Sequence, residues 1–177
     1  MLLAIDVGNT QTVLGIYDND TLVHMWRVAT NVDHTSDELR IKLHTLMMAE
    51  DLEYSRIDGA ILASVVPALT HNWEKACCRS FGVETLIVSA ASAGHLIKVD
   101  MEKFPELGAD RVADAVAAKN LYGDPVIVVD FGTATNIEII GKGGIFLGGI
   151  IAPGVESSMR SLFTRAALLR SVELEDP

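Results

Sequence analysis

Two short segments of the chain share an order of residue types that suits phosphate chemistry. They are residues 6–12, which read DVGNTQT, and residues 130–135, which read DFGTAT. Each follows an apolar run and continues from Asp-x-Gly into small hydroxyl or amide residues. Glycine lets the backbone approach a ligand closely, and loop amides can then bind phosphate oxygens. Two such loops that face each other across a cleft would bind the phosphates of a nucleotide, and its metal, from both sides.

The aspartate that begins each loop is a candidate cation ligand. Asp6 lies at the end of an apolar run, where it is well placed to bind hydrated Mg²⁺, which takes only one or two carboxylates. Asp130 follows four apolar residues, 126–129, so we expect a buried strand whose end presents this carboxylate to a cation. Thr133 and Thr135 would bind phosphate or the same cation. A plain Asp-Gly hairpin turn explains one copy well, but explains two copies at the start of equivalent units less well.

A third segment, residues 108–111 (GADR), lies between the two loops and opens a helix. Asp110 is either a helix cap or a general base, with Arg111 binding an anionic part of the substrate. A helix N-terminus lowers the pKa of a carboxylate, which weakens it as a base. Phosphoryl transfer tolerates a weak base, because positioning carries most of the catalysis.

A glycine pair, Gly148-Gly149, lies in the strand that runs toward Pro153-Gly154. The pair indicates either a close approach by backbone or ligand, or a simple packing requirement. The sequence leaves both interpretations open.

Composition and charge exclude several classes of protein. The formal charge is −10 over 177 residues, which argues against non-specific binding to nucleic acid. No apolar run is long enough to span a membrane, and the N-terminus does not resemble a signal peptide. The only cysteines, Cys77 and Cys78, are adjacent and cannot form a disulfide framework, so we read them as packing residues and expect a reducing, cytoplasmic setting.

Hydrophobic patterning predicts a complete α/β unit in the first part of the chain. We expect strands at 2–7, 12–17, 21–28, 57–66 and 84–88, and helices at 35–48 and 69–81. The order of three strands, helix, strand, helix, strand is the ribonuclease-H-like βββαβαβ pattern, a mixed sheet with helices packed on it. The overall fold class is therefore α/β.

The pattern restarts after a connector at 89–107 and a helix at 110–122. We expect strands at 126–130, 135–140 and 145–151, and a helix from Gly154 to about Leu169. A three-stranded sheet with one helix would expose an apolar face and an unpaired edge, so we expect the chain to be a fragment or to be completed by another polypeptide. The expected division is 1–107 for the first domain, 108–124 for a linking helix and 125–177 for the beginning of a second ribonuclease-H-like domain.

Four segments in order resemble type III pantothenate kinases, of the acetate and sugar kinase and actin-like superfamily. They are residues 6–10, 108–111, 130–135 and 148–154, and residues 157–174 are also similar to that family. The resemblance implies a duplicated fold with a cleft between two domains. It also implies ATP-dependent phosphorylation of pantothenate to 4'-phosphopantothenate, the first step toward coenzyme A, with Mg²⁺ and a monovalent cation, K⁺ or NH₄⁺.

The same resemblance implies roles for individual residues. The first ATP-phosphate loop would comprise Asp6, Val7, Gly8, Asn9, Thr10, Gln11, Thr12 and Val13. Thr133 would contact ATP, and Asp130 would bind the monovalent cation. Pantothenate would contact Gly108, Ala109, Asp110 and Arg111, with Asp110 as proton acceptor. The family is typically a homodimer with its substrate sites near the interface.

The chain also departs from the family pattern. Family members continue beyond this length and carry a Gly-Lys-Asn-Thr segment that is not in this sequence. Residues 88–91 read VSAA where Val-Gly-Pro-Gly is frequent, Met101 replaces a frequent aromatic, and Asn136 replaces the usual threonine. Two alternatives therefore stay open: an inactive or regulatory relative, of the kind formerly labelled a transcriptional activator, or a related small-molecule kinase with a different acceptor.

Overall fold

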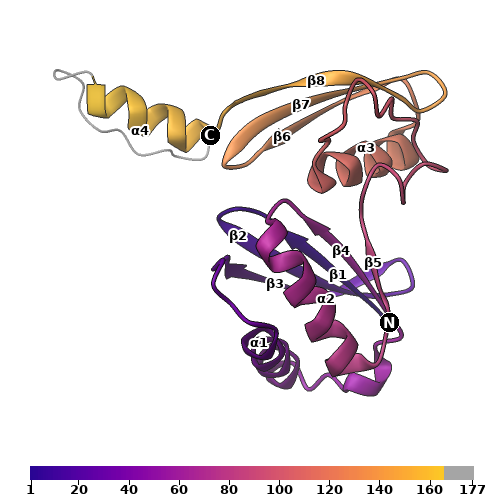
Figure 1. Cartoon of the computed structure of the whole chain (residues 1–177), viewed down its shortest axis with the longest axis vertical. Helices are drawn as coiled ribbons and strands as arrows, with labels where there is room; N and C mark the ends of the chain where they lie inside the picture. Colours follow the sequence, from indigo (N-terminus) through magenta and orange to yellow (C-terminus); the bar gives the residue numbers. More distant parts are fainter. Residues whose placement is uncertain (166–177) are drawn as a thin grey trace.

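The computed structural model describes residues 1–165, which form two sheets with helices packed on them (Figure 1). The first sheet contains β1 (Leu2–Val7), β2 (Gln11–Asp18), β3 (Thr21–Ala29), β4 (Gly59–Ser64) and β5 (Thr85–Ile87). Its spatial order is β3-β2-β1-β4-β5, with β1 to β3 antiparallel and with β4 and β5 parallel to β1. The mixed sheet predicted from the hydrophobic pattern is confirmed.

Two helices cover one face of this sheet: α1 (Ser36–Ala49) and α2 (Pro67–Phe81). A capping box begins α1, because the Glu38 amide donates to the Thr35 hydroxyl and the Thr35 amide donates to the Glu38 carboxylate. Helix α2 begins at Pro67 and ends at Gly82, whose φ of 69° suits glycine. A short 3₁₀ turn, η1 (Tyr54–Arg56), precedes β4, so the strand expected from residue 57 begins two residues later.

The first core lies between this sheet and the two helices. Its largest fully buried side chains are Leu3, Ile5, Leu14, Ile16, Leu39, Leu43, Met47, Leu62, Leu69 and Trp73. Cys77 belongs to the same cluster, and burial raises the pKa of its thiol to about 12. Cys77 is therefore a packing residue, as expected from the sequence, whereas Cys78 is exposed.

The second sheet is antiparallel and contains β6 (Val126–Phe131), β7 (Ala134–Gly141) and β8 (Ile145–Pro153) in that order. Helix α3 (Ala109–Tyr122) packs on one face of it, in a second core with residues from the connector at 89–107. The connector also pairs with the sheet, because Lys98 forms a parallel bridge with Ile145. Helix α4 (Val155–Arg165) follows β8, and the expected continuation of this helix to about Leu169 lies outside the described residues.

The expectation that the strand before Asp130 is buried is wrong. Ile127 is 64% exposed and Val129 is 48% exposed, and half-buried and exposed positions alternate along β6. The cause is that α3 covers only one face of this sheet, so the side chains of β6 on the other face stay exposed. The exposed apolar face expected of a three-stranded sheet is confirmed on the opposite side, where the large exposed side chains are Ile127, Val129, Phe131, Ile139, Leu147 and Ile150.

None of the helices within residues 1–165 has the length and apolar character needed to cross a membrane.

Two adjacent methionines on α1 provide a matched test of the first core. Met47 is 1% exposed and Met48 is 62% exposed. We expect Met47→Ala to lower the free energy of unfolding by about 2–5 kcal/mol, because it leaves a cavity among side chains from both helices. Met48→Ala should change it by less than about 0.5 kcal/mol. Urea denaturation followed by circular dichroism measures both, and equal losses would contradict the packing of α1 described above.

Candidate active site

The loop that follows β1 is a tight turn held by its neighbours. The Gly8 amide donates to the Gln11 carbonyl at 3.0 Å, and a Cβ at Gly8 would lie 3.0 Å from that same oxygen. Thr30, just after β3, donates from its hydroxyl to the Gly8 carbonyl at 2.8 Å and from its amide to the Thr10 carbonyl at 3.0 Å. Its hydroxyl is also 2.9 Å from that of Thr12. Sequence reasoning missed Thr30, since it is distant in sequence and belongs to no motif.

The second loop, between β6 and β7, is fixed by the start of α4. The Gly154 amide donates to the Thr133 carbonyl at 3.1 Å, and a Cβ at Gly154 would lie 2.5 Å from that oxygen and would also overlap the Gly132 carbonyl. Only glycine therefore fits at position 154. Beside the loop, the Asn136 amide group on β7 approaches the Asp130 carboxylate on β6 at 3.5 Å.

The two loops face each other. The Thr10 hydroxyl of the first lies 3.0 Å from the Thr133 hydroxyl of the second, and both groups are exposed. This contact joins residues that are far apart in the sequence and belong to different sheets. The geometry is the one that the repeated Asp-x-Gly pattern predicted, with two phosphate-type loops opposite one another.

The third motif opens α3, as expected, but Asp110 is not its cap. Gly108 occupies the N-cap position, and Asp110 is the second helical residue. The Asp110 carboxylate accepts a hydrogen bond of 2.7 Å from the Arg111 amide, one of the free amides of the first turn. A Cβ at Gly108 would lie 2.5 Å from that carboxylate oxygen. Gly108, which has no Cβ, therefore leaves room for the Asp110 carboxylate.

Arg111 forms a buried ion pair that the sequence did not reveal. Its Nε donates to Glu138 Oε1 at 2.7 Å, and Glu138, on β7, has no exposed surface. The guanidinium also lies 5.7 Å from the centre of the Phe146 ring. A Cβ at Gly149 would overlap both the Ile137 carbonyl of β7 and the Arg111 guanidinium. Gly149 therefore permits the close approach by backbone that the sequence suggested, and it also leaves room for an arginine side chain from α3.

Five carboxylates gather around these elements, and two of them were missed. Desolvation raises the pKa of Asp6, and the negative charges of Asp110 and Asp130 raise it further. Asp114, one helical turn after Asp110 on α3, has its pKa raised to about 6 by desolvation and then by the charge of Asp130 and three other carboxylates. Burial also raises the pKa of Glu138, against the opposing effect of Arg111.

The donor set fits a cation held partly through water. Within residues 1–165, no three His, Cys, Asp or Glu side chains converge as a complete metal-binding group. Mg²⁺ needs only one or two protein carboxylates, because it keeps several of its waters. Asp6 and Asp130 begin facing loops. They are close enough for the negative charge of Asp130 to raise the pKa of Asp6. A cation between the loops would relieve that repulsion.

The raised pKa of Asp114 predicts a pH dependence of stability. An acid whose pKa is higher in the folded state stabilises that state below the unfolded pKa of 3.8, and this contribution is lost as the pH rises through about 6. Asp114→Asn should therefore raise the free energy of unfolding at pH 7 and leave it almost unchanged at pH 3.5. Chemical denaturation at both pH values measures the difference. Asp20→Asn, in the exposed turn after β2, is the control, and an equal gain in both variants would contradict the clustering of charge at Asp114.

Solved structures with a similar fold have low sequence identity to this chain. A conserved putative Baf family transcriptional activator from Campylobacter jejuni aligns with a TM-score of 0.53 and 17% identity, over 92% of this chain and 59% of that one. Ethanolamine utilization protein EutJ from Carboxydothermus hydrogenoformans aligns with a TM-score of 0.51 and 19% identity, over 93% of this chain and 56% of that one. At these identities the likeness establishes the α/β fold alone.

The sequence comparisons are more specific. The family model of type III pantothenate kinase matches residues 2–177. A type III pantothenate kinase of Halalkalibacterium halodurans is 44% identical over all of this chain and 69% of its own length. That of Streptomyces avermitilis is 42% identical over all of this chain and 68% of its own length. These matches show that the chain belongs to the type III pantothenate kinase family.

Proposed function

We propose that this chain provides the phosphate-binding and acceptor-binding elements of an enzyme that transfers the γ-phosphoryl group of ATP to the hydroxyl of pantothenate. The product is 4'-phosphopantothenate, and the reaction is the first step of coenzyme A biosynthesis. The observation that carries the proposal is the 3.0 Å contact between Thr10 and Thr133, because it sets two phosphate-type loops opposite one another. Membership of the family is the reason for choosing pantothenate as the acceptor.

The ATP side consists of residues 6–13 and Thr133. Free amides of the first loop and the two threonine hydroxyls are suited to phosphate oxygens. Asp6 would hold Mg²⁺ through water, and Asp130 would hold a monovalent cation, K⁺ or NH₄⁺, with the Asn136 amide group beside its carboxylate. Such cations neutralise the charge that develops on the transferring group.

The acceptor side consists of Gly108, Ala109, Asp110 and Arg111. Asp110 accepts the proton of the pantothenate hydroxyl, and its bond to the Arg111 amide fixes the carboxylate at the helix start. The Nε of Arg111 is used by Glu138, so the Nη atoms are left to bind an anionic part of the acceptor. A weak base suffices, since positioning dominates phosphoryl transfer.

Two features of the proposal rest on the family resemblance. These are the homodimer, with substrate sites near its interface, and the cytoplasmic location. The alternative acceptor and the regulatory role remain the competing hypotheses, because residues 88–91, Met101 and Asn136 depart from the family pattern.

The role of Asp110 predicts a loss of turnover in Asp110→Asn. The amide keeps the size of the side chain but cannot accept the proton, so kcat should fall by about 10²–10⁴-fold with little change in the free energy of unfolding. The assay follows phosphopantothenate formation from ATP, Mg²⁺, K⁺ and pantothenate by mass spectrometry.

Asp51→Asn, an exposed turn residue after α1, is the control and should leave kcat unchanged. Full activity of Asp110→Asn would remove the proton-acceptor role but not the kinase class. Turnover of other hydroxy acids in preference to pantothenate would favour the alternative acceptor.

The facing threonines predict a specific effect on ATP binding. Thr10→Val and Thr133→Val each remove one hydroxyl from the loop contact and should raise the KM for ATP about ten-fold, because a hydrogen bond to a charged phosphate is lost. The KM for pantothenate should change little. Thr21→Val, in an exposed position at the start of β3, is the control. A fall in stability without a change in the KM for ATP would indicate that the two hydroxyls only hold the loops together.

A further inference from the structure

A separate open groove lies between α1 and α2, and it shares no lining residue with the two loops or with α3. Its volume is about 450 Å³. The lining includes Asp37, Arg40, Ile41, His44, Tyr54 and Arg79. We refer to these residues as the α1–α2 groove.

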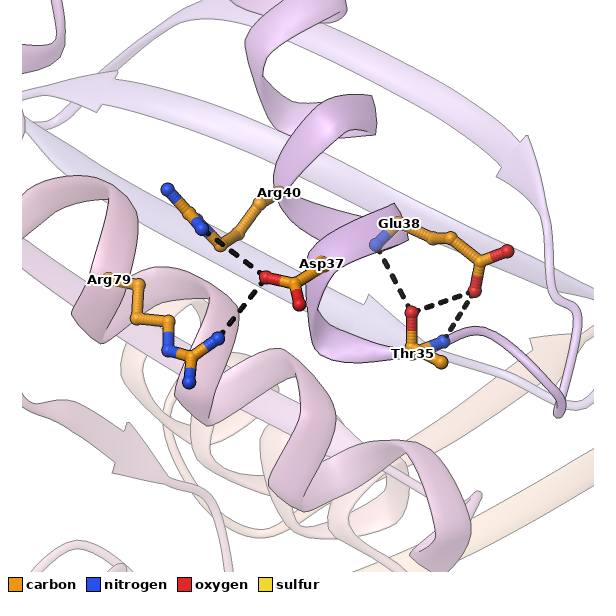
Figure 2. A network of polar contacts seen from close by, with 5 residues as sticks. All are labelled: Thr35, Asp37, Glu38, Arg40 and Arg79. Atoms are coloured by element: carbon orange, nitrogen blue, oxygen red, sulfur yellow. Dashed lines mark hydrogen bonds and ion pairs between the residues drawn. The ribbon is translucent and has the colours of Figure 1, made fainter.

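The groove contains more positive than negative charge, in a chain whose net charge is −10. Arg40 and Arg79 project from different helices onto a single oxygen of Asp37, with Nη1 to Oδ1 distances of 3.3 and 3.1 Å (Figure 2). Glu38 does not neutralise them, because its carboxylate is turned away into the capping box with Thr35 (Figure 2). One carboxylate therefore serves two guanidinium groups.

One hydrogen-bond donor of Arg40 lacks an acceptor. Arg40 Nε is buried and has no hydrogen-bond partner among residues 1–165. A buried donor on a charged group that lacks a partner is unfavourable and is uncommon in folded proteins. Both arginine side chains are still 43–44% exposed, so a ligand can reach them. At the place where the two guanidinium groups meet, both Nη1 atoms share the single Asp37 Oδ1 oxygen, so further acceptor oxygens could be bound there.

The groove also offers apolar surface next to the arginines. Ile41 is 66% exposed on α1, and Tyr54 on η1 lines the same groove, with its hydroxyl 3.1 Å from His44 Nδ1. An anionic head on the arginines would leave room for an organic group against this surface. The groove therefore has the two parts of a site for an amphipathic anion.

We propose that the α1–α2 groove binds a small organic phosphate whose dianionic head bridges Arg40 and Arg79 and whose organic part packs on Ile41 and Tyr54. A dianion is required because Asp37 already supplies a monocarboxylate within the same molecule. A phosphate monoester carries about −1.5 to −2 charges at pH 7 and presents three oxygens, so it can displace Asp37 from both arginines. Guanidinium groups suit this geometry, because their donors match phosphate oxygens in pairs.

The test is isothermal titration calorimetry of the whole chain with phenyl phosphate, which joins a dianionic head to an apolar ring. Arg79→Gln should weaken binding about ten-fold, because one charged contact is lost. Asp37→Asn should strengthen binding several-fold, because the competing carboxylate is removed. Lys75→Gln is the matched control, since this exposed cation lies one turn before Arg79 on α2 and does not line the groove.

Two further probes define the ligand class. Benzoate, with the same ring and one charge, should bind much more weakly than phenyl phosphate, and inorganic phosphate should bind more weakly because it lacks the ring. Arg79→Lys, which keeps the charge but not the paired donors, should give an intermediate affinity.

The phosphate loops provide a competing location for phenyl phosphate, and the variants separate the two. Binding that is insensitive to Arg79→Gln and Asp37→Asn, but lost in Thr133→Val, would overturn the proposal and would be compatible with the proposed kinase site. Equal affinity for benzoate would overturn it as well. Failure of kinase activity alone would leave the groove proposal intact, because its readout is binding to residues outside the kinase site.

Discussion

The position of the candidate active site depends on the buried ion pair between Arg111 and Glu138. It ties the first turn of α3 to the central strand of the second sheet at 2.7 Å, with Glu138 fully buried and Arg111 largely so. A pair of this kind does not by itself add much stability, but removal of one partner costs about 3–5 kcal/mol because the other charge is left buried. Gly149 leaves the space that the guanidinium fills. Asp110, the neighbour of Arg111, is therefore held in place through a contact that it does not make itself.

The ion pair between Arg111 and Glu138 places the acidic first turns of α3 close to the two loops that begin with Asp6 and Asp130. Asp110 and Asp114 lie on successive turns of α3, and the charge of Asp110 raises the pKa of both Asp6 and Asp114. The resulting repulsion between carboxylates is unfavourable, and a cation bound there would relieve it. We infer that this clustering of negative charge makes the protein less stable than its packing alone would allow, which is a common property of functional sites.

The sequence predicts those parts of the fold that local patterns determine. Thr35 and Glu38 mark the start of α1 because a capping box is a local interaction, and the Asp-x-Gly loops are visible for the same reason. Glu138 and Asp114 were missed because their importance depends on which face of β7 meets which face of α3. The apolar run 126–129 was misread as a buried strand, since a run of β-branched residues looks the same in a central strand and in an edge strand. The domain boundaries and the roles of the site residues stay predictions.

The two loops have the same sequence pattern but are held by different parts of the chain. The first is braced within its own sheet, because Thr30 at the end of β3 binds the Gly8 and Thr10 carbonyls. The second is braced by the entry into α4, where the Gly154 amide binds the Thr133 carbonyl. The start of α4 therefore helps to set the position of Thr133, whereas the first sheet helps to set that of Thr10. The 3.0 Å contact between the two hydroxyls depends on both supports.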